Sequence, residues 1–279
     1  MTQTAGIDVG STYTKAIVLD DESKIVGRSL VRTGFRLPEA AREAFDLALD
    51  DARLSADDVA YVASTGFGRF QVDFRQLNVT DLTAASWGSR HLFPKTRTVL
   101  DVGGQTMKAT QIDESCRVKS FRLNDKCAAG TGAFLEKTAH YLGYDIEEIG
   151  PLAAESEETV PISGVCAVFA ESEVINHLSQ GTSPEAIMHG SILSLVKRSI
   201  QLMKRVGVRS EVTLVGGILR FDTMVFEIRQ NLDGAEVNVP DEDLAQFVPA
   251  LGAAVLARRR AEKAPESMLT ASVGESSEA

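Results

Sequence analysis

One pattern of residues occurs twice along the chain, and this repeat limits the possible folds more than any other feature. Residues 8–25 align without a gap with residues 101–118. Identical residue types fall at corresponding positions, including Asp8 and Asp101, Val9 and Val102, Gly10 and Gly103, Lys15 and Lys108, Ala16 and Ala109, and Asp20 and Asp113. Both copies alternate short β-type runs with turn residues, which is typical of antiparallel hairpins. The repeat therefore predicts two related lobes, each beginning with the same hairpin.

The remaining periodicity extends the hairpins into two lobes of helices and strands. The first lobe is expected over residues 1–96, and the second, more helical lobe over residues 97–263. In the second lobe a long helix over 184–206 begins at a serine cap followed by proline. The last helix, 247–261, is expected to belong to this lobe and to pack back at the hinge. Residues 264–279 are rich in Ser, Glu and Ala without periodicity, which predicts a disordered tail.

The composition is that of a globular protein without a basic surface. Hydrophobic residues make up 44% of the chain and charged residues 24%, enough of each for a packed core and a polar exterior. The net charge of −10 argues against a nucleic-acid or anionic-membrane partner. The sequence shows no signal-peptide pattern and no apolar run of about 18 residues, and three cysteines are too few for a disulfide framework. We therefore expect a cytoplasmic protein with no nucleic-acid or membrane partner.

The first hairpin has residues suited to binding phosphate and magnesium. Gly10 lets the backbone approach a ligand closely, so that N–H groups of the turn can point at phosphate oxygens. Asp8, at the end of the preceding strand, can hold Mg²⁺ through water, which suits an ion that keeps most of its hydration shell. The side chains after the glycine that offer hydroxyl groups or positive charge to phosphate are Ser11, Thr12, Thr14 and Lys15.

The second hairpin and a late pair of glycines extend the nucleotide hypothesis. The hairpin offers a second carboxylate and a second glycine turn, in Asp101, Gly103, Gly104 and Gln105. Gly216 and Gly217 follow a predicted strand over 211–215, where a nucleoside can pass close to the backbone. One such hairpin alone is better explained as a plain β-turn. Two hairpins together with the late glycine pair favour a nucleotide-binding protein.

This order of hairpins and glycines resembles the superfamily of acetate and sugar kinases, Hsp70 and actin, over residues 5–261. The resemblance implies an α/β fold of two ribonuclease-H-like lobes with an ATP cleft between them. It also implies that Asp8 lies near Mg²⁺ and that Asp101 lies near the γ-phosphate, where it orients the attacking water. Gln105 is expected to help place that water, because phosphoryl transfer depends mainly on positioning and charge neutralisation.

Three segments narrow the resemblance to one family. They are 64–69 (Ser-Thr-Gly-Phe-Gly-Arg), 124–132 (Asn-Asp-Lys-Cys-Ala-Ala-Gly-Thr-Gly) and 162–173 (Ile-Ser-Gly-Val-Cys-Ala-Val-Phe-Ala-Glu-Ser-Glu). Together they resemble the ATPase family of 2-hydroxyacyl-CoA dehydratase activators and benzoyl-CoA reductase subunits, the BadF/BadG/BcrA/BcrD ATPases. The resemblance implies that Cys127 and Cys166 ligate a [4Fe–4S] cluster shared between two subunits.

The cysteines can also be judged from their surroundings in the sequence. Cys127 and Cys166 each precede a predicted helix, whose unpaired N–H groups and positive dipole end stabilise a thiolate. A [4Fe–4S] cluster usually takes four thiolates, so a chain with two suitable sulfurs needs a second chain to complete the set. Without the family resemblance, two buried structural cysteines are the simpler interpretation. Cys116 lies in a hairpin turn and is expected to be incidental.

The residues after the first cysteine connect the two hypotheses. Gly130, Thr131 and Gly132 permit close backbone approach and are expected to lie near the nucleotide, so that ATP and cluster share one helix. The second hairpin also runs directly into Cys127. We therefore expect ATP binding or hydrolysis to change the potential of the cluster or its distance from an electron acceptor.

Three functions are compatible with these features. The family resemblance implies either a subunit of an ATP-dependent reductase of the benzoyl-CoA type or a homodimeric activator of a 2-hydroxyacyl-CoA dehydratase. The third, from another class, is a small-molecule kinase without a cluster. That function leaves Cys127 and Cys166 unexplained, and no segment resembles a substrate-binding insertion.

Two departures from the activators favour the reductase subunit. The activators carry an Asp after the Gly-Gly-Gln of the second hairpin and an Arg after Gly-Thr-Gly, whereas Thr106 and Ala133 stand here. A reductase subunit of this kind is an ATP-hydrolysing oxidoreductase component that shares its cluster with a related ATPase subunit. The resemblance further implies acyl-CoA-reducing subunits as electron acceptors and a ferredoxin-type protein as electron donor.

Overall fold

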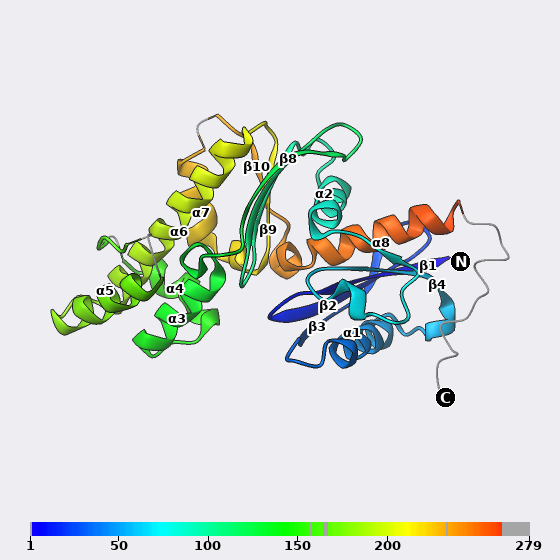
Figure 1. Ribbon diagram of the computed structural model, residues 1–279, viewed down its shortest axis with the longest axis horizontal. Helices are drawn as coiled ribbons and strands as arrows, with labels where there is room; N and C mark the ends of the chain where they lie inside the picture. Colours follow the sequence, from blue (N-terminus) through cyan, green and yellow to red (C-terminus); the bar gives the residue numbers. More distant parts are fainter. Residues whose placement is uncertain (1, 157, 164–166, 233, 264–279) are drawn as a thin grey trace. The chain divides into compact units, whose positions relative to one another are not determined.

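The computed structural model describes residues 2–156, 158–163, 167–232 and 234–263. Cys166 and the predicted tail 264–279 lie outside the described residues. The chain divides into two units (Figure 1). Unit 1 comprises Met1–Pro94 and Phe247–Ala279, and unit 2 comprises Lys95–Gln246.

Unit 1 is built on a five-stranded mixed sheet with the order β3-β2-β1-β4-β5. Its strands are β1 (Gln3–Val9), β2 (Tyr13–Leu19), β3 (Ile25–Arg32), β4 (Val59–Thr65) and β5 (Leu77–Asn78). The first three are antiparallel neighbours, whereas β4 and β5 are added in parallel. The hairpin predicted from the first copy of the repeat is therefore confirmed.

Helix α1 (Leu37–Ala52) covers one face of this sheet with a stripe of small and aromatic side chains. Residues three and four apart lie on one side of a helix, so Ala41, Phe45 and Ala48 all face inward and are fully buried. Gly27 of β3 allows the helix to approach closely, because a Cβ atom at that position would overlap with the carbonyl oxygen of Ala48.

Helix α8 (Val248–Ala261) covers the opposite face of the same sheet, whereas the sequence pattern placed it in the second lobe. Small residues cause this packing. Gly6 of β1 lies against the α8 backbone, where a Cβ atom would overlap with Ala250 and Ala254. On its other side α8 contacts α2 (Asp81–Leu92), and Gly252 meets the α2 backbone at a similarly close distance. Unit 1 thus takes its last helix from the end of the chain.

Unit 2 repeats the sheet of unit 1, with the order β8-β7-β6-β9-β10. Its strands are β6 (Thr98–Val102), β7 (Met107–Ile112), β8 (Val118–Asn124), β9 (Val212–Val215) and β10 (Val237–Asn238). Again the first three are antiparallel, and the last two are added in parallel. The two sheets therefore share one topology, and the repeat in the sequence covers only their first strands.

The turns after β2 and β7 match in their hydrogen bonds. Each is closed by an aspartate Oδ1 that accepts two backbone N–H groups, from Glu22 and Lys24 at Asp20 and from Ser115 and Arg117 at Asp113. Both turns contain one residue of positive φ, Ser23 at 65° and Cys116 at 59°. Cys116 is thus a buried residue at a left-handed turn position, where the first copy carries serine.

The helices of unit 2 gather on one side of its sheet in Figure 1. They are α3 (Gly132–Leu142), α4 (Ile149–Ala154), α5 (Ala167–Ser179), α6 (Pro184–Val206) and α7 (Asp222–Gln230). Helix α6 begins as predicted, because the hydroxyl of Ser183 accepts the N–H of Ala186 at 3.3 Å. Its buried side, which includes Ile192 and Leu195, forms the centre of the unit 2 core.

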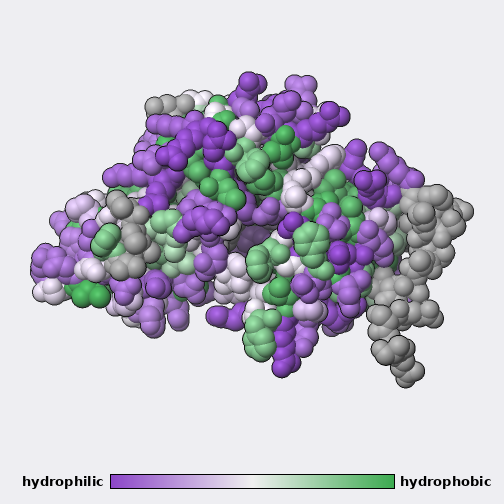
Figure 2. Space-filling model, viewed as in Figure 1, coloured by the Kyte–Doolittle hydropathy of each residue, from purple (hydrophilic) through white to green (hydrophobic). Residues whose placement is uncertain are grey.

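Apolar residues form a separate core in each unit. Hydrophilic residues cover most of the face shown in Figure 2, with apolar residues in small groups between them. Within the described ranges, no helix is both long enough and apolar enough to span a membrane.

Candidate nucleotide and cluster site

The first candidate magnesium ligand, Asp8, lies at the end of β1 in an ion pair. Its Oδ2 is 3.5 Å from Nζ of Lys15, the residue opposite it in the β1–β2 register. Asp8 is only 7% exposed, and Nζ of Lys15 also donates to the carbonyl oxygen of Tyr13 at 3.2 Å. Lys15, predicted to add charge at the phosphates, is therefore engaged with the aspartate and the hairpin backbone.

Gly66, which follows β4, makes room for this carboxylate. Its φ is +87°, a region that favours glycine. A Cβ atom at this position would overlap with Oδ1 of Asp8. Strand β4 lies parallel to β1, with Thr65 opposite Asp8. The sequence motif 64–69 contains this glycine, but only the strand pairing reveals that it borders the aspartate.

The tip of the first hairpin is held by a residue that the sequence analysis did not select, Thr33. Its hydroxyl donates to the carbonyl oxygen of Gly10 at 2.8 Å, and its N–H donates to that of Thr12 at 3.0 Å. Because the single Thr33 proton goes to Gly10, the buried Thr14 hydroxyl 2.9 Å away is the donor in their mutual bond. Thr14 thus braces the hairpin in this arrangement, while Ser11 is exposed and Thr12 is partly exposed.

The second hairpin repeats the carboxylate site of the first. Asp101 is 7% exposed, and its Oδ2 lies 3.3 Å from Nζ of Lys108, its register partner. Gly216, after the parallel strand β9, has φ of +103°. A Cβ atom there would lie 2.9 Å from Oδ1 of Asp101. Gly216 therefore corresponds to Gly66, and the repeat includes a glycine far beyond the hairpin in the sequence.

The tip of the second hairpin is bonded to the start of α3. The carbonyl oxygens of Gly103 and Gly104 accept the N–H groups of Gly132 and Ala133, at 2.9 and 2.8 Å. Gln105, predicted to help place water, is exposed at this tip. Three of the predicted glycines are thus brought together, and they connect the hairpin with the helix that follows Cys127.

The glycine pair after β9 leads into a short helix whose end lines a pocket within unit 2. Gly216 donates its N–H to the carbonyl oxygen of Ala245 at 2.8 Å, and Gly217 begins a 3₁₀-helix, Gly217–Arg220. The end of this 3₁₀-helix lines a pocket of about 760 Å³. Its apolar wall includes Leu219 and Phe221.

The loop that carries Cys127 is closed by one side chain, Asn124. The Asn124 Oδ1 atom accepts the N–H of Cys127 at 3.3 Å, and Nδ2 donates to the carbonyl oxygens of Cys127 at 3.1 Å and Gly130 at 3.4 Å. A Cβ atom at Gly130 would overlap with Nδ2 of Asn124, and the hydroxyl of the buried Thr131 donates to the carbonyl of Ala128 at 2.9 Å. Gly130 and Thr131, predicted to lie near the nucleotide, therefore shape the cysteine loop itself.

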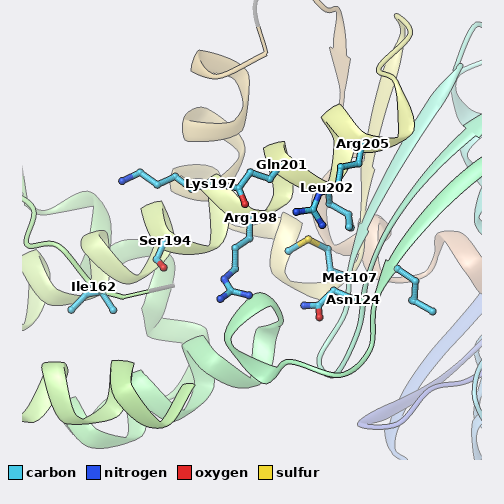
Figure 3. A pocket seen from close by; sticks show the side chains of 10 residues that line it. Met107, Asn124, Ile162, Ser194, Lys197, Arg198, Gln201, Leu202 and Arg205 are labelled. Atoms are coloured by element: carbon cyan, nitrogen blue, oxygen red, sulfur yellow. The ribbon is translucent and has the colours of Figure 1, made fainter. Parts of the chain in front are cut away.

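Arg198 of α6 approaches the same cysteine. Its Nη1 lies 3.6 Å from Sγ of Cys127, and its buried Nε has no hydrogen-bond partner among the described residues. Figure 3 shows Arg198 pointing from α6 toward the segment that carries Asn124, whereas Lys197 points away. The surrounding pocket, about 570 Å³ in volume, is also lined by Arg205, and no carboxylate is among the described residues that line it.

The described part of this loop fits a thiolate-ligated, anionic group. Cys127 is partly exposed at the N-terminus of a 3₁₀-helix, Ala128–Gly130, and Arg198 brings a cation and an unused buried donor to its side. The other predicted ligand, Cys166, lies outside the described residues. Within the described ranges, no three His, Cys, Asp or Glu side chains are grouped so that they could hold a metal ion.

Comparison with known proteins relates the chain to one family. The model of the BadF/BadG/BcrA/BcrD ATPase family matches residues 5–257. The chain is 35% identical over 265 residues to the 2-hydroxyisocaproyl-CoA dehydratase activator of Clostridioides difficile, covering 95% of this chain and 98% of that protein. It is 34% identical over 273 residues to a benzoyl-CoA reductase subunit of Thauera aromatica, covering 94% and 95%.

Solved structures give the same relationship and the fold. The activator of the 2-hydroxyisocaproyl-CoA dehydratase from Clostridium difficile with bound ADPNP matches with a TM-score of 0.88 at 35% identity, covering 94% of this chain and 96% of that one. A ROK family glucokinase from Streptomyces griseus matches with a TM-score of 0.56 at 17% identity, covering 92% and 99%. The second likeness concerns the fold alone. The α/β fold of the kinase, Hsp70 and actin superfamily, expected from the sequence, is confirmed.

Proposed function

The chain belongs to the BadF/BadG/BcrA/BcrD ATPase family, and from this we propose that it couples ATP hydrolysis to electron transfer toward an enzyme acting on an acyl-CoA. The observation that supports ATP binding and hydrolysis is the repeated carboxylate site. Asp8 and Asp101 each end a central strand, pair with a lysine and lie beside a glycine of positive φ. A lone buried charge is costly, so the paired lysines stabilise carboxylates that are available to a ligand at the strand ends.

We assign the roles in ATP hydrolysis as follows. Asp8 holds Mg²⁺ through water, and Ser11 and Thr12 offer hydroxyl groups to phosphate at the hairpin tip. Asp101 orients the attacking water, with Gln105 at the exposed tip of the second hairpin as its helper. These roles require positioning and charge, which is what phosphoryl transfer demands of a protein.

Four further residues complete the proposed nucleotide site. We propose that the nucleoside passes close to the backbone at Gly216 and Gly217. These glycines precede Leu219, which lines the pocket. Lys15 and Lys108 are proposed to act mainly through their aspartate partners, because both ammonium groups are already within ion-pair distance of a carboxylate.

The electron-transfer part rests on Cys127 and Cys166. We propose that these residues supply two of four thiolates to a [4Fe–4S] cluster and that a second chain supplies the other two. When bound, the cluster supplies one-electron chemistry. The Cys127 loop supports this proposal because Cys127 is partly exposed and its sulfur lies beside the Arg198 cation.

The hydrogen bonds between the second hairpin and α3 support a link between the two parts. Gly103 and Gly104 follow Asp101 by two and three residues, and their carbonyl oxygens accept hydrogen bonds from the first residues of the helix after Cys127. A nucleotide that shifts this tip therefore also shifts the cysteine loop. We propose this connection as the route by which ATP alters electron transfer.

Two partner arrangements remain as candidates. Thr106 and Ala133, which differ from the activator pattern, favour a reductase subunit with a related ATPase subunit and acyl-CoA-reducing subunits. The 35% identity to a dehydratase activator favours a homodimer that activates a separate dehydratase. In both arrangements we propose a ferredoxin-type protein as electron donor.

The test is anaerobic purification of the full chain, expressed alone and together with the partners of the reductase arrangement. These partners are the related ATPase subunit and the acyl-CoA-reducing subunits. We expect one [4Fe–4S] cluster for every two chains, ATP hydrolysis, and loss of the cluster but not of the fold in Cys127→Ser. A stable complex with other subunits identifies the reductase arrangement, and a lone homodimer identifies the activator. Cluster-free wild-type protein that phosphorylates a small molecule would overturn the proposal in favour of the kinase.

A further inference from the structure

We propose that Arg198 is a positioning residue that donates a hydrogen bond to the ligating sulfur of Cys127 and raises the reduction potential of the cluster. This inference rests on the proposed function, because it presupposes a cluster at Cys127. It assigns a role to a residue of α6 that no motif includes.

The geometry around Cys127 brings the Arg198 cation to the sulfur. Nη1 of Arg198 is 3.6 Å from Sγ, within the range of a hydrogen bond to sulfur. A Cβ atom at Gly130 would overlap with Nδ2 of Asn124, whereas it would only be in ordinary contact with Cδ of Arg198 at 3.5 Å. The absence of a side chain at Gly130 therefore leaves room for the Asn124 amide that closes the Cys127 loop.

A second observation points to a further acceptor at this place. The Nε atom of Arg198 is buried and has no partner among the described residues. Buried donors are almost always hydrogen-bonded, so an unused one calls for an explanation. A cluster bound at Cys127 would carry sulfur atoms besides that of the cysteine, and such atoms would be acceptors for a guanidinium group with donors in a fixed fork.

The charge around the pocket agrees with an anionic group. Lys197, Arg198 and Arg205 lie along one stretch of α6, and no ion pair of theirs is formed within the described ranges. The one nearby carboxylate of the loop, Asp125, is paired with Lys126 at 3.6 Å. In a chain of net charge −10, this is a local positive potential, which attracts and stabilises negative charge.

The effect on the cluster follows from the charge change in its reduction. One electron from an external reductant adds one negative charge to the cluster, and no bond is made or broken. Positive charge and hydrogen bonds to the sulfurs stabilise the more negative state, and thereby raise the reduction potential. Loss of the guanidinium must therefore make the cluster harder to reduce.

The first experiment is a redox titration of the cluster-loaded protein, followed by its absorbance. In Arg198→Gln we expect the ratio of reduced to oxidised cluster at the wild-type midpoint to fall about tenfold, which corresponds to about 59 mV for one electron. Arg198→Lys should recover part of the shift. Lys197→Gln removes the same charge from the neighbouring residue that points away, and should shift the midpoint less. Equal midpoints in Arg198→Gln and Lys197→Gln would overturn the inference.

The second experiment needs no cluster and separates this inference from the proposed function. In the Cys116→Ser/Cys166→Ser background Cys127 is the remaining thiol, and serine is the natural residue at the turn position equivalent to Cys116, Ser23. The modification rates of Cys127 are compared for an anionic sulfonatoethyl and a cationic trimethylammonioethyl methanethiosulfonate. The ratio of the two rates cancels differences in thiol accessibility and reactivity.

We expect the anionic-to-cationic rate ratio to fall about tenfold when Arg198→Gln is added, and to change less with Lys197→Gln. An unchanged ratio would show that the Arg198 charge is not at the sulfur, and the inference fails whatever the cofactor. A changed ratio in a protein that never binds a cluster places Arg198 at Cys127, overturns its role in tuning a cluster, and marks the proposed function as the part that failed.

Discussion

The two hairpins of the molecule share their base and differ at their tips. At the base, each has an aspartate at the end of the central strand, a lysine opposite it and a glycine of positive φ beside it. At the tip, the first hairpin is tied to its own unit by the hydroxyl and N–H of Thr33. The second is tied to α3 through the carbonyl oxygens of Gly103 and Gly104.

This difference indicates which parts of the repeat have the same function in both units. The shared base is a rigid frame for a carboxylate, and both units need it in the same form. The tips contact different neighbours, so they are free to diverge. The first tip is hydrogen-bonded within unit 1, whereas the second tip is hydrogen-bonded to the start of the helix after Cys127, where we propose that it couples to the cysteine loop.

The largest effects should come from the carboxylates, and they should differ between the hairpins. In Asp101→Asn we expect ATP hydrolysis to fall about 10²- to 10⁴-fold, the range for loss of a group that assists proton transfer, with ATP still bound. In Asp8→Asn we expect weaker binding of ATP in the presence of Mg²⁺. Steady-state hydrolysis and equilibrium dialysis with and without Mg²⁺ measure the two effects. If both variants lose binding and hydrolysis in the same proportion, the hairpins do not have separate roles.

The glycines beside the carboxylates should show equal effects in the two units. Gly66→Ala and Gly216→Ala combine a positive φ with overlap against a carboxylate and a carbonyl oxygen. We expect each to reduce the free energy of unfolding by about 2–4 kcal/mol, the sum of backbone strain and overpacking. Urea unfolding of the single variants measures this reduction.

Each unit supplies a matched control for the glycine substitutions. Gly34 in unit 1 and Gly234 in unit 2 also have positive φ, at 57° and 69°, but a Cβ atom would meet nothing within 4 Å. We expect Gly34→Ala and Gly234→Ala to lower the free energy of unfolding by only about 1–2 kcal/mol, the cost of the left-handed conformation. Equal losses in controls and test variants would mean that the glycines do not serve the carboxylates.

The link between the second tip and α3 can be broken at a single hydrogen bond. Ala133→Pro removes the N–H that bonds Gly104, and proline is tolerated there because residue 133 lies in the first turn of α3. Loss of a hydrogen bond of about 0.5–1.5 kcal/mol should weaken the ATP dependence of electron transfer by up to about tenfold. Hydrolysis itself should change less. Ala133→Ser keeps the N–H and is the control; equal behaviour of both variants would exclude this bond from the coupling.

Much of the fold could be predicted from the sequence, because repeated residues imply repeated local structure. The Asp-x-Gly pattern and the alternation around it predict β1, β2, β6 and β7, and the turn aspartates predict how these hairpins close. The place of α8 was not available in the same way. Its small residues indicate close packing, but they do not identify the strand against which the helix packs. That strand is β1, where Gly6 lets the backbone of α8 approach, and this contact is evident only from the structure.

The candidate site was predictable where its residues are close in the sequence. Asp8, Asp101 and the glycines of both tips stand in short motifs. Thr33 and Arg198 do not, because they reach the hairpin and Cys127 from other elements. Arg198 looks like an ordinary helix cation, and the signal that could have found it is its place between Leu195 and Leu202 on a largely buried helix.

The smallest effect should come from the turn aspartates, whose hydrogen bonds match in the two units. The hydrogen bond from the backbone N–H of Arg117 is the main cause that holds the pKa of Asp113 below its usual 3.8. Desolvation opposes this lowering but is the smaller effect. The N–H of Ser115 and the charges of Lys119 and Arg117 lower the pKa further. Because the folded pKa lies below the unfolded one, Asp113 stabilises the fold above about pH 4. This contribution is lost as the pH falls through the folded pKa.

Asp113→Asn should therefore lower the free energy of unfolding slightly at neutral pH, and the difference from wild type should vanish at a pH below the folded pKa. The effect is small because the carboxylate is exposed to solvent and ions. Asp20→Asn removes the equivalent negative charge in unit 1 and is the matched comparison at neutral pH, where we expect a similar small loss. Unfolding measured from about pH 7 to about pH 2.5 follows the difference, and NMR gives the titration of Asp113 directly. A midpoint at or above 3.8 for this carboxyl would mean that its two backbone hydrogen bonds contribute nothing to the turn.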